Sequence, residues 1–180
     1  MVSEVLLPLL AIAAGVMFLA GVAKLRSPAS AQEAMSGFGL PPSLTLARGL
    51  GAIEVWIGGL CLIAPGRMAL TALVSAYLVF AFVLGARWLR GERQAPCGCF
   101  GDSSVPTHLG HLAMNLVCAA VALAAVVKPP PSLTTIFGYG LPALALLVGI
   151  GCSVYLIFAL LTLLPDSWRA YNAGQGDRAA

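Results

Sequence analysis

Five stretches of the sequence are mostly apolar over about the 20 residues that a membrane-spanning helix needs. They lie at about 5–25, 44–64, 68–90, 107–127 and 141–164. Along the whole chain 59% of the residues are apolar and 9% are charged, whereas a soluble domain carries about 25% charged residues. The sequence therefore predicts an all-α integral membrane protein in the lipid bilayer. We expect a single transmembrane bundle over 1–165, with a polar C-terminal tail over 166–180.

The charged residues exclude one class of partner and indicate an orientation. With 10 Lys and Arg spread along the chain against 7 Asp and Glu, no basic patch forms, and we expect no nucleic-acid partner. Lys and Arg near the span ends collect on the cytoplasmic side of a membrane. The first loop, the third loop and the tail hold eight of them, Lys24, Arg26, Arg48, Arg87, Arg90, Arg93, Arg169 and Arg178, and the other side holds Arg67 and Lys128. This bias places the third loop in the cytoplasm.

The third loop carries two neighbouring thiols in the run Arg93-Gln-Ala-Pro-Cys-Gly-Cys-Phe-Gly-Asp102. Thiols at i and i+2 can close a small disulfide, because a disulfide tolerates Cα atoms up to ~6.8 Å apart. Gly98 supplies backbone freedom between them, and a strained, accessible disulfide is readily reduced. The following helix start favours a thiolate. We predict that Cys97 and Cys99 are the catalytic thiols of an exchange reaction.

Two alternatives to thiol exchange stay open. Cys97, Cys99, His108 and His111 offer two sulfurs and two nitrogens, which suits a copper- or zinc-binding or metal-transfer module. Otherwise the protein is a membrane scaffold in which the thiols are incidental. Cys61, Cys118 and Cys152 lie within apolar spans, where we expect them to be small buried hydrophobic residues.

Two helix faces are expected to support the thiols. His108, His111, Asn115 and Cys118 stand at i, i+3, i+7 and i+10, on one side of the fourth span. They serve either in proton handling or in bonds between helices. The second span offers a matching surface of small residues around one acid, Ala47, Gly51, Glu54, Gly58 and Cys61. A buried carboxylate needs a partner. For Glu54 we expect it from another helix, with His108 or His111 as candidates, and Glu54 either exchanges protons with the thiols or joins helices.

The segment from Arg26 to Ser43 is rich in Pro, Gly and Ser. It holds apolar residues that suit a short segment lying along the membrane interface. The alternative is an ordinary loop.

The run Cys97-Gly-Cys-Phe-Gly101 before the fourth span is similar to the signature of the methylamine-utilisation membrane protein family MauE, a branch of the DoxX-like membrane proteins. The runs Ala20–Pro28 and Gly39–Pro42 resemble the DoxX-like pattern, and Glu54 occupies the usual acid of that family. The resemblance covers about residues 5–127. In one departure, Met114 precedes Asn115 where relatives often have Arg.

The resemblance implies a DoxX-like four-helix transmembrane bundle with an additional C-terminal transmembrane helix, in the bacterial cell (inner) membrane. It also implies work with a thioredoxin-like partner in maturing an exported disulfide-containing protein, in the type family the small subunit of methylamine dehydrogenase. The sequence shows no haem, flavin or nucleotide motif, so we expect no bound cofactor; a quinone enters by analogy with vitamin K epoxide reductase-like bundles alone. An exported client would place Cys97 and Cys99 outside, against the loop charges, whereas a cytosolic site suits a reductant relay.

Overall fold

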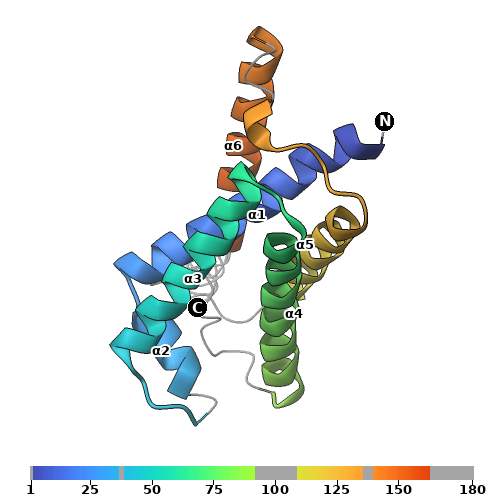
Figure 1. The fold of residues 1–180 in the computed structure, drawn as a ribbon. Coiled ribbons are helices and arrows are strands. Elements are labelled where there is room, and N and C mark those ends of the chain that lie inside the picture. Colours follow the sequence, from blue (N-terminus) through green and yellow to red (C-terminus); the bar gives the residue numbers. More distant parts are fainter. Residues whose placement is uncertain (1, 37–38, 92–108, 136–139, 163–180) are drawn as a thin grey trace, which may run out of the picture.

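The computed structural model describes residues 2–36, 39–91, 109–135 and 140–162. They form the helices α1 (Val2–Arg26), α2 (Ala29–Ser36), α3 (Leu44–Ile63), α4 (Arg67–Leu89), α5 (Leu109–Val127) and α6 (Leu141–Thr162) (Figure 1). No strand occurs among these residues. The chain is all-α wherever the structure describes it.

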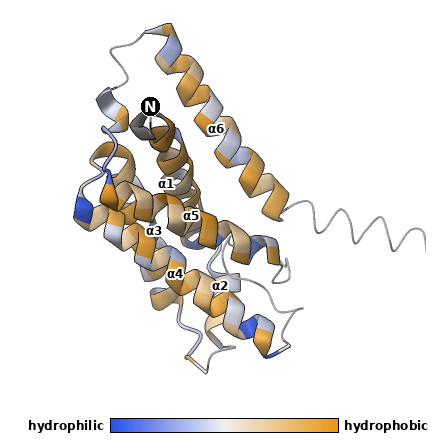
Figure 2. Cartoon of the chain, turned by 90° about the vertical axis from the view of Figure 1, so that its right-hand side faces the viewer, coloured by the Kyte–Doolittle hydropathy of each residue, from blue (hydrophilic) through white to orange (hydrophobic). Residues whose placement is uncertain are grey.

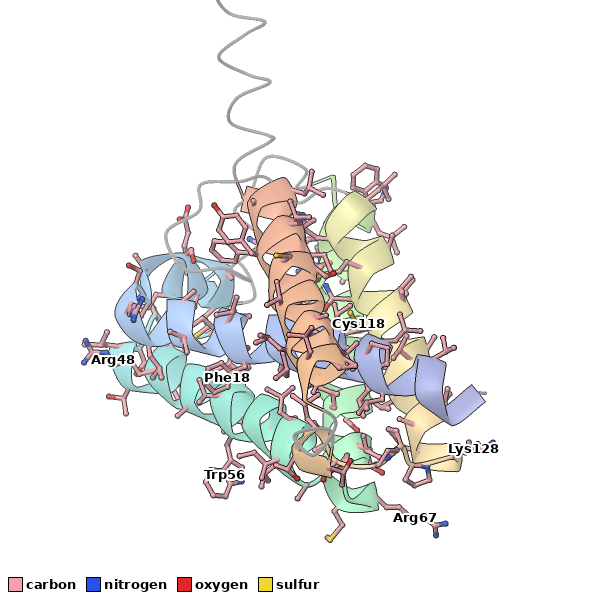
Figure 3. All side chains as sticks on the ribbon, turned by 90° about the horizontal axis from the view of Figure 1, so that it is seen from above. Phe18, Arg48, Trp56, Arg67, Cys118 and Lys128 are labelled. Atoms are coloured by element: carbon pink, nitrogen blue, oxygen red, sulfur yellow. The ribbon has the colours of Figure 1, made fainter. Side chains whose placement is uncertain are left out.

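Five of these helices, α1, α3, α4, α5 and α6, are long and apolar enough to cross a membrane. Their outward faces are largely apolar (Figure 2). Trp56 points away from the bundle with 69% of its surface exposed, as Figure 3 shows, and Phe82 is 75% exposed. Large side chains in such positions are stable against lipid tails and costly against water. The predicted all-α integral membrane protein is confirmed.

Helix α1 lies at the centre of the arrangement. It packs against α3, α5 and α6, and also touches α2, while α4 packs along α5 (Figure 1). Helix α6 packs chiefly on α1 and leaves most of its surface exposed (Figure 2). The core is therefore built around α1, from Leu10, Ala14 and Met17 outward.

The contact between α1 and α3 depends on glycine. A Cβ at Gly21 would lie 2.5 Å from the Gly51 carbonyl oxygen, and one at Gly58 would lie 2.7 Å from the Ala14 carbonyl oxygen. Both distances are shorter than real contacts allow, so the two backbones touch. The buried face of α3 is the predicted one, Ala47, Gly51, Glu54, Gly58 and Cys61. This face packs against α1, however, and not against the polar stripe of α5. Small residues let any neighbouring helix approach closely, so their pattern does not identify which helix that is.

The segment between α1 and α3 contains a short helix. Residues Ala29–Ser36 form α2, with Ser30 and Ala31 buried. The alternative of an ordinary loop is therefore wrong for these eight residues. Helix α3 then begins after Ser43, whose hydroxyl accepts a hydrogen bond from the Leu46 backbone N–H at 3.4 Å, as expected of an N-cap.

Two cations counted as loop residues lie inside the bundle. Lys24 is in α1 with 2% of its surface exposed, and Arg87 is in α4 with 3% exposed. Arg48 lies at the opposite end of the molecule from Arg67 and Lys128 (Figure 3). These three cations therefore lie at opposite ends, as the loop assignment predicts. Lys24 and Arg87 are not loop residues, and because charges buried in a membrane protein usually pair internally, they are left out of the loop charges used to predict orientation.

Candidate functional site

Several polar and charged side chains are buried in the bundle. Among the described residues they are Lys24, Ser30, Glu54, Arg87, His111 and Asn115. Polar groups inside a membrane are costly and therefore mark either internal bonds or a functional site. These residues come from α1, α2, α3, α4 and α5.

Two of these residues form an ion pair between α1 and α3. Lys24 Nζ lies 2.8 Å from Glu54 Oε2, and the two side chains are 2% and 1% exposed. Lys24 Nζ also lies 5.3 Å from the centre of the Phe80 ring, within the range of a cation–π contact. The second oxygen, Glu54 Oε1, is buried and accepts no hydrogen bond from any residue that the structure describes.

The ion pair corrects the sequence prediction for Glu54. The partner does come from another helix, as expected, but it is Lys24 rather than His108 or His111. Lys24 was missed because it stands where the first apolar run ends and was counted with the first loop. One signal was present in the sequence. Lys24 follows Gly21 by three residues, as Glu54 follows Gly51, so each charge lies beside a glycine on its own helix.

A cavity of about 20 Å³ lies next to the ion pair. Its walls include Ala20 and Lys24 from α1, Tyr77 and Phe80 from α4, and Met114 and Asn115 from α5. Such a volume accommodates about one water molecule. The three helices thus border a small space whose exposed lining is apolar, with the alkyl part of Lys24 in its wall.

The polar stripe of α5 faces the bundle interior over the part that is described. His111, Asn115 and Cys118 are buried, and Asn115 Nδ2 donates a hydrogen bond to the His111 carbonyl oxygen at 2.7 Å. Met114, which precedes Asn115, lines the cavity with it. His108, the first residue of the predicted stripe, lies outside the described residues.

Tyr77 was not predicted as part of the site. Its hydroxyl donates a hydrogen bond to the Ala13 carbonyl oxygen at 2.6 Å across the bundle. A tyrosine inside an apolar span is the signal that could have found it, since a buried phenol needs a partner.

Replacing Tyr77 with Phe tests how much this bond contributes. Ala13 keeps its place in α1, so the loss should be that of one buried hydrogen bond, about 0.5–1.5 kcal/mol of unfolding free energy. Reversible unfolding in mixed micelles measures it, with Tyr155→Phe on the exposed face of α6 as the matched control. An equal effect of both changes would show that the bond to Ala13 contributes nothing.

The predicted catalytic thiols lie outside the described residues, since Cys97, Gly98 and Cys99 fall within 92–108. Of the remaining cysteines, Cys61 and Cys118 are buried free thiols, as expected, but Cys152 is exposed on α6. The prediction that Cys152 is buried is wrong because α6 offers just one narrow face to α1. Within the described ranges, no three His, Cys, Asp or Glu side chains gather as a metal site would require.

Comparison with known proteins identifies a family. A family model described as "Methylamine utilisation protein MauE" matches residues 2–128, which include the thiol motif and helices α1 to α5. Neither the curated proteins nor the solved structures contain a significant match.

Proposed function

Because the chain belongs to the MauE family of methylamine utilisation proteins, we propose that it is a membrane protein of thiol–disulfide redox chemistry. Cys97 and Cys99 exchange with a thioredoxin-like partner, and the exchange serves the processing or maturation of an exported disulfide-containing protein. The observation that carries this proposal is the Cys97-Gly98-Cys99 motif, which lies within the family match and directly before α5.

The proposed exchange balances without a further reactant. The thiolate of one cysteine attacks a disulfide of the partner and forms a mixed disulfide, releasing one partner thiolate. The second cysteine then attacks the mixed disulfide, so that Cys97 and Cys99 become joined and the partner leaves as a dithiol. Two electrons and two protons pass to the partner, and the reverse steps return them.

The buried residues of α5 support this proposal. The helix that follows the motif carries His111 and Asn115 into the interior, where Asn115 shares a cavity with Lys24. That the start of the following helix favours a thiolate at Cys97 or Cys99 stays a prediction from the sequence, because both residues lie outside the described ranges. The proposed bacterial cell membrane setting agrees with the family and with the five candidate spans.

Serine substitution tests the thiols. We expect Cys97→Ser and Cys99→Ser each to abolish exchange with a thioredoxin-like protein, because either change removes a sulfur that the two-step reaction needs. One of the two variants should accumulate the mixed disulfide, which is visible on non-reducing gels. Cys152→Ser is the matched control, since Cys152 is exposed on α6, and it should exchange normally.

Three outcomes would count against redox function. In the first, alkylation of intact cells shows that Cys97 and Cys99 are permanently reduced. In the second, a double serine variant functions fully, which indicates a scaffold. Alternatively, purified protein would hold stoichiometric copper or zinc that is lost in Cys99→Ser, which indicates the metal module. Labelling of a variant that keeps Cys97 alone, with a membrane-impermeant thiol reagent after mild reduction, determines the side of the membrane.

A further inference from the structure

Two exposed arginines lie where α1 ends and α3 begins. Arg26 is the last residue of the candidate span of α1, and Arg48 follows Leu44, the first residue of the candidate span of α3, by four positions. Both arginines are exposed, and Figure 3 shows Arg48 pointing away from the bundle. Cations near the ends of spans extend their charged groups toward the lipid headgroups.

The packing of α1 against α3 brings the two arginines to nearly the same depth. A Cβ at Gly51 would lie 3.3 Å from Leu25 Cγ, and the two helices run in opposite directions. At a rise of about 1.5 Å per residue, Arg48 lies about 4.5 Å beyond Gly51 toward this end of the bundle, and Arg26 about 1.5 Å beyond Leu25. One layer of headgroups can therefore reach both side chains.

The two guanidinium groups have no anionic partner within the described part of the chain. Neither Arg26 nor Arg48 forms an ion pair there, and Glu33, the exposed acid on the nearby α2, pairs with neither of them. A guanidinium group presents five N–H donors in a planar fork that fits phosphate oxygens. Among the described residues nothing competes with an external anion for these donors.

An exposed apolar surface directly precedes Arg48 in the turn into α3. It contains Leu40, Leu44 and Leu46, which are 55%, 45% and 54% exposed, and the exposed prolines Pro41 and Pro42. An arginine whose Cα lies deeper extends its guanidinium group outward to the level of such leucines. Cations beside apolar side chains suit the boundary where headgroups meet acyl chains. An acidic protein would match the arginines but would leave the leucines against polar groups.

We propose that Arg26 and Arg48 bind the phosphate headgroup of an anionic phospholipid, with the exposed leucines of the turn against the upper part of the same lipid. Basic residues contributed by neighbouring transmembrane helices bind anionic headgroups in this way. The occupant is a lipid of the surrounding membrane. This inference goes beyond the thiol chemistry and does not depend on it.

Binding of phosphatidylglycerol to the full chain in detergent, measured by native mass spectrometry, tests the site. The wild type should bind it more tightly than phosphatidylcholine, whose headgroup also carries a cation. Arg26→Gln and Arg48→Gln should each weaken phosphatidylglycerol binding about fivefold, the contribution of one cation near an anionic lipid surface, and leave phosphatidylcholine binding unchanged. Arg48→Lys keeps the charge and should retain most of the affinity.

Arg67→Gln is the matched control, because Arg67 is exposed at the opposite end of the bundle (Figure 3), and it should bind the lipid like the wild type. Equal thermal unfolding of all variants checks that they fold.

Four results would overturn the inference. The wild type shows no preference for phosphatidylglycerol, or Arg67→Gln weakens binding as much as Arg48→Gln. In the third, inorganic phosphate at the lipid concentration displaces the lipid, which indicates a simple anion site. In the fourth, the Arg26 and Arg48 variants bind the lipid normally but lose a thioredoxin-like protein, which assigns the surface to a protein partner.

Discussion

Replacing Lys24 with Met lowers the free energy of unfolding by about 3–5 kcal/mol, because Glu54 is left charged and buried without its partner. The pair is 2% and 1% exposed, so water cannot take the place of the lost ammonium group. The cost should shrink at low pH, since a protonated Glu54 carries no charge to be stranded. Reversible unfolding in mixed micelles at several pH values measures both effects.

The control for this prediction is Lys128→Met. Lys128 is exposed at the far end of the bundle (Figure 3), and its loss should change stability by no more than about 0.5 kcal/mol. A double change, Lys24→Met with Glu54→Leu, should recover most of the lost stability, because no unpaired charge remains. Strictly additive effects of the two single changes would mean that the pair makes no coupled contribution.

Gly58→Ala is the second change with a large expected effect. The new Cβ would lie 2.7 Å from the Ala14 carbonyl oxygen and 2.8 Å from the Phe18 backbone nitrogen. Both atoms belong to the backbone of α1, so neither can rotate aside and the two helices must separate. Overpacking of this kind costs about 1–3 kcal/mol.

The neighbouring Gly59 provides the matched control on the same helix. A Cβ at Gly59 would lie 3.9 Å from the Phe18 ring, which is an ordinary contact. Gly59→Ala should therefore be neutral or raise stability by up to about 1 kcal/mol, because alanine is the better helix former. Thermal unfolding of both variants in one detergent compares them. If Gly59→Ala proved as harmful as Gly58→Ala, the close approach of α1 and α3 would be refuted.

The sequence predicts most of the helices because apolar length is a local property. The predicted span 44–64 corresponds to α3 over Leu44–Ile63, and 141–164 to α6 over Leu141–Thr162. The buried face of α3 also follows from spacing alone, since residues three and four apart share a side of a helix. Spacing does not say which helix covers that face, so the contact with α1 could not be predicted.

The sequence predicts the candidate site less completely, because two of its charged residues are assigned to loops. A hydropathy reading ends a span at its first cation, so Lys24 was counted in a loop although α1 continues to Arg26. The burial of Arg87 was missed in the same way. Pairing between Lys24 and Glu54 joins residues 30 positions apart, and no local pattern encodes such a contact. The roles of Cys97, Cys99 and His108 stay predictions from the sequence and the family.

The separation of Lys24 and Glu54 along the chain has a consequence for membrane insertion. At about 5–20 residues per second, the ribosome adds the carboxylate a few seconds after the ammonium group that it will neutralise. During that interval Lys24, near the end of α1, can extend its amine toward the headgroups. Since a buried ammonium group needs its partner, we expect the amine to withdraw into the hydrocarbon only after α3 has been added.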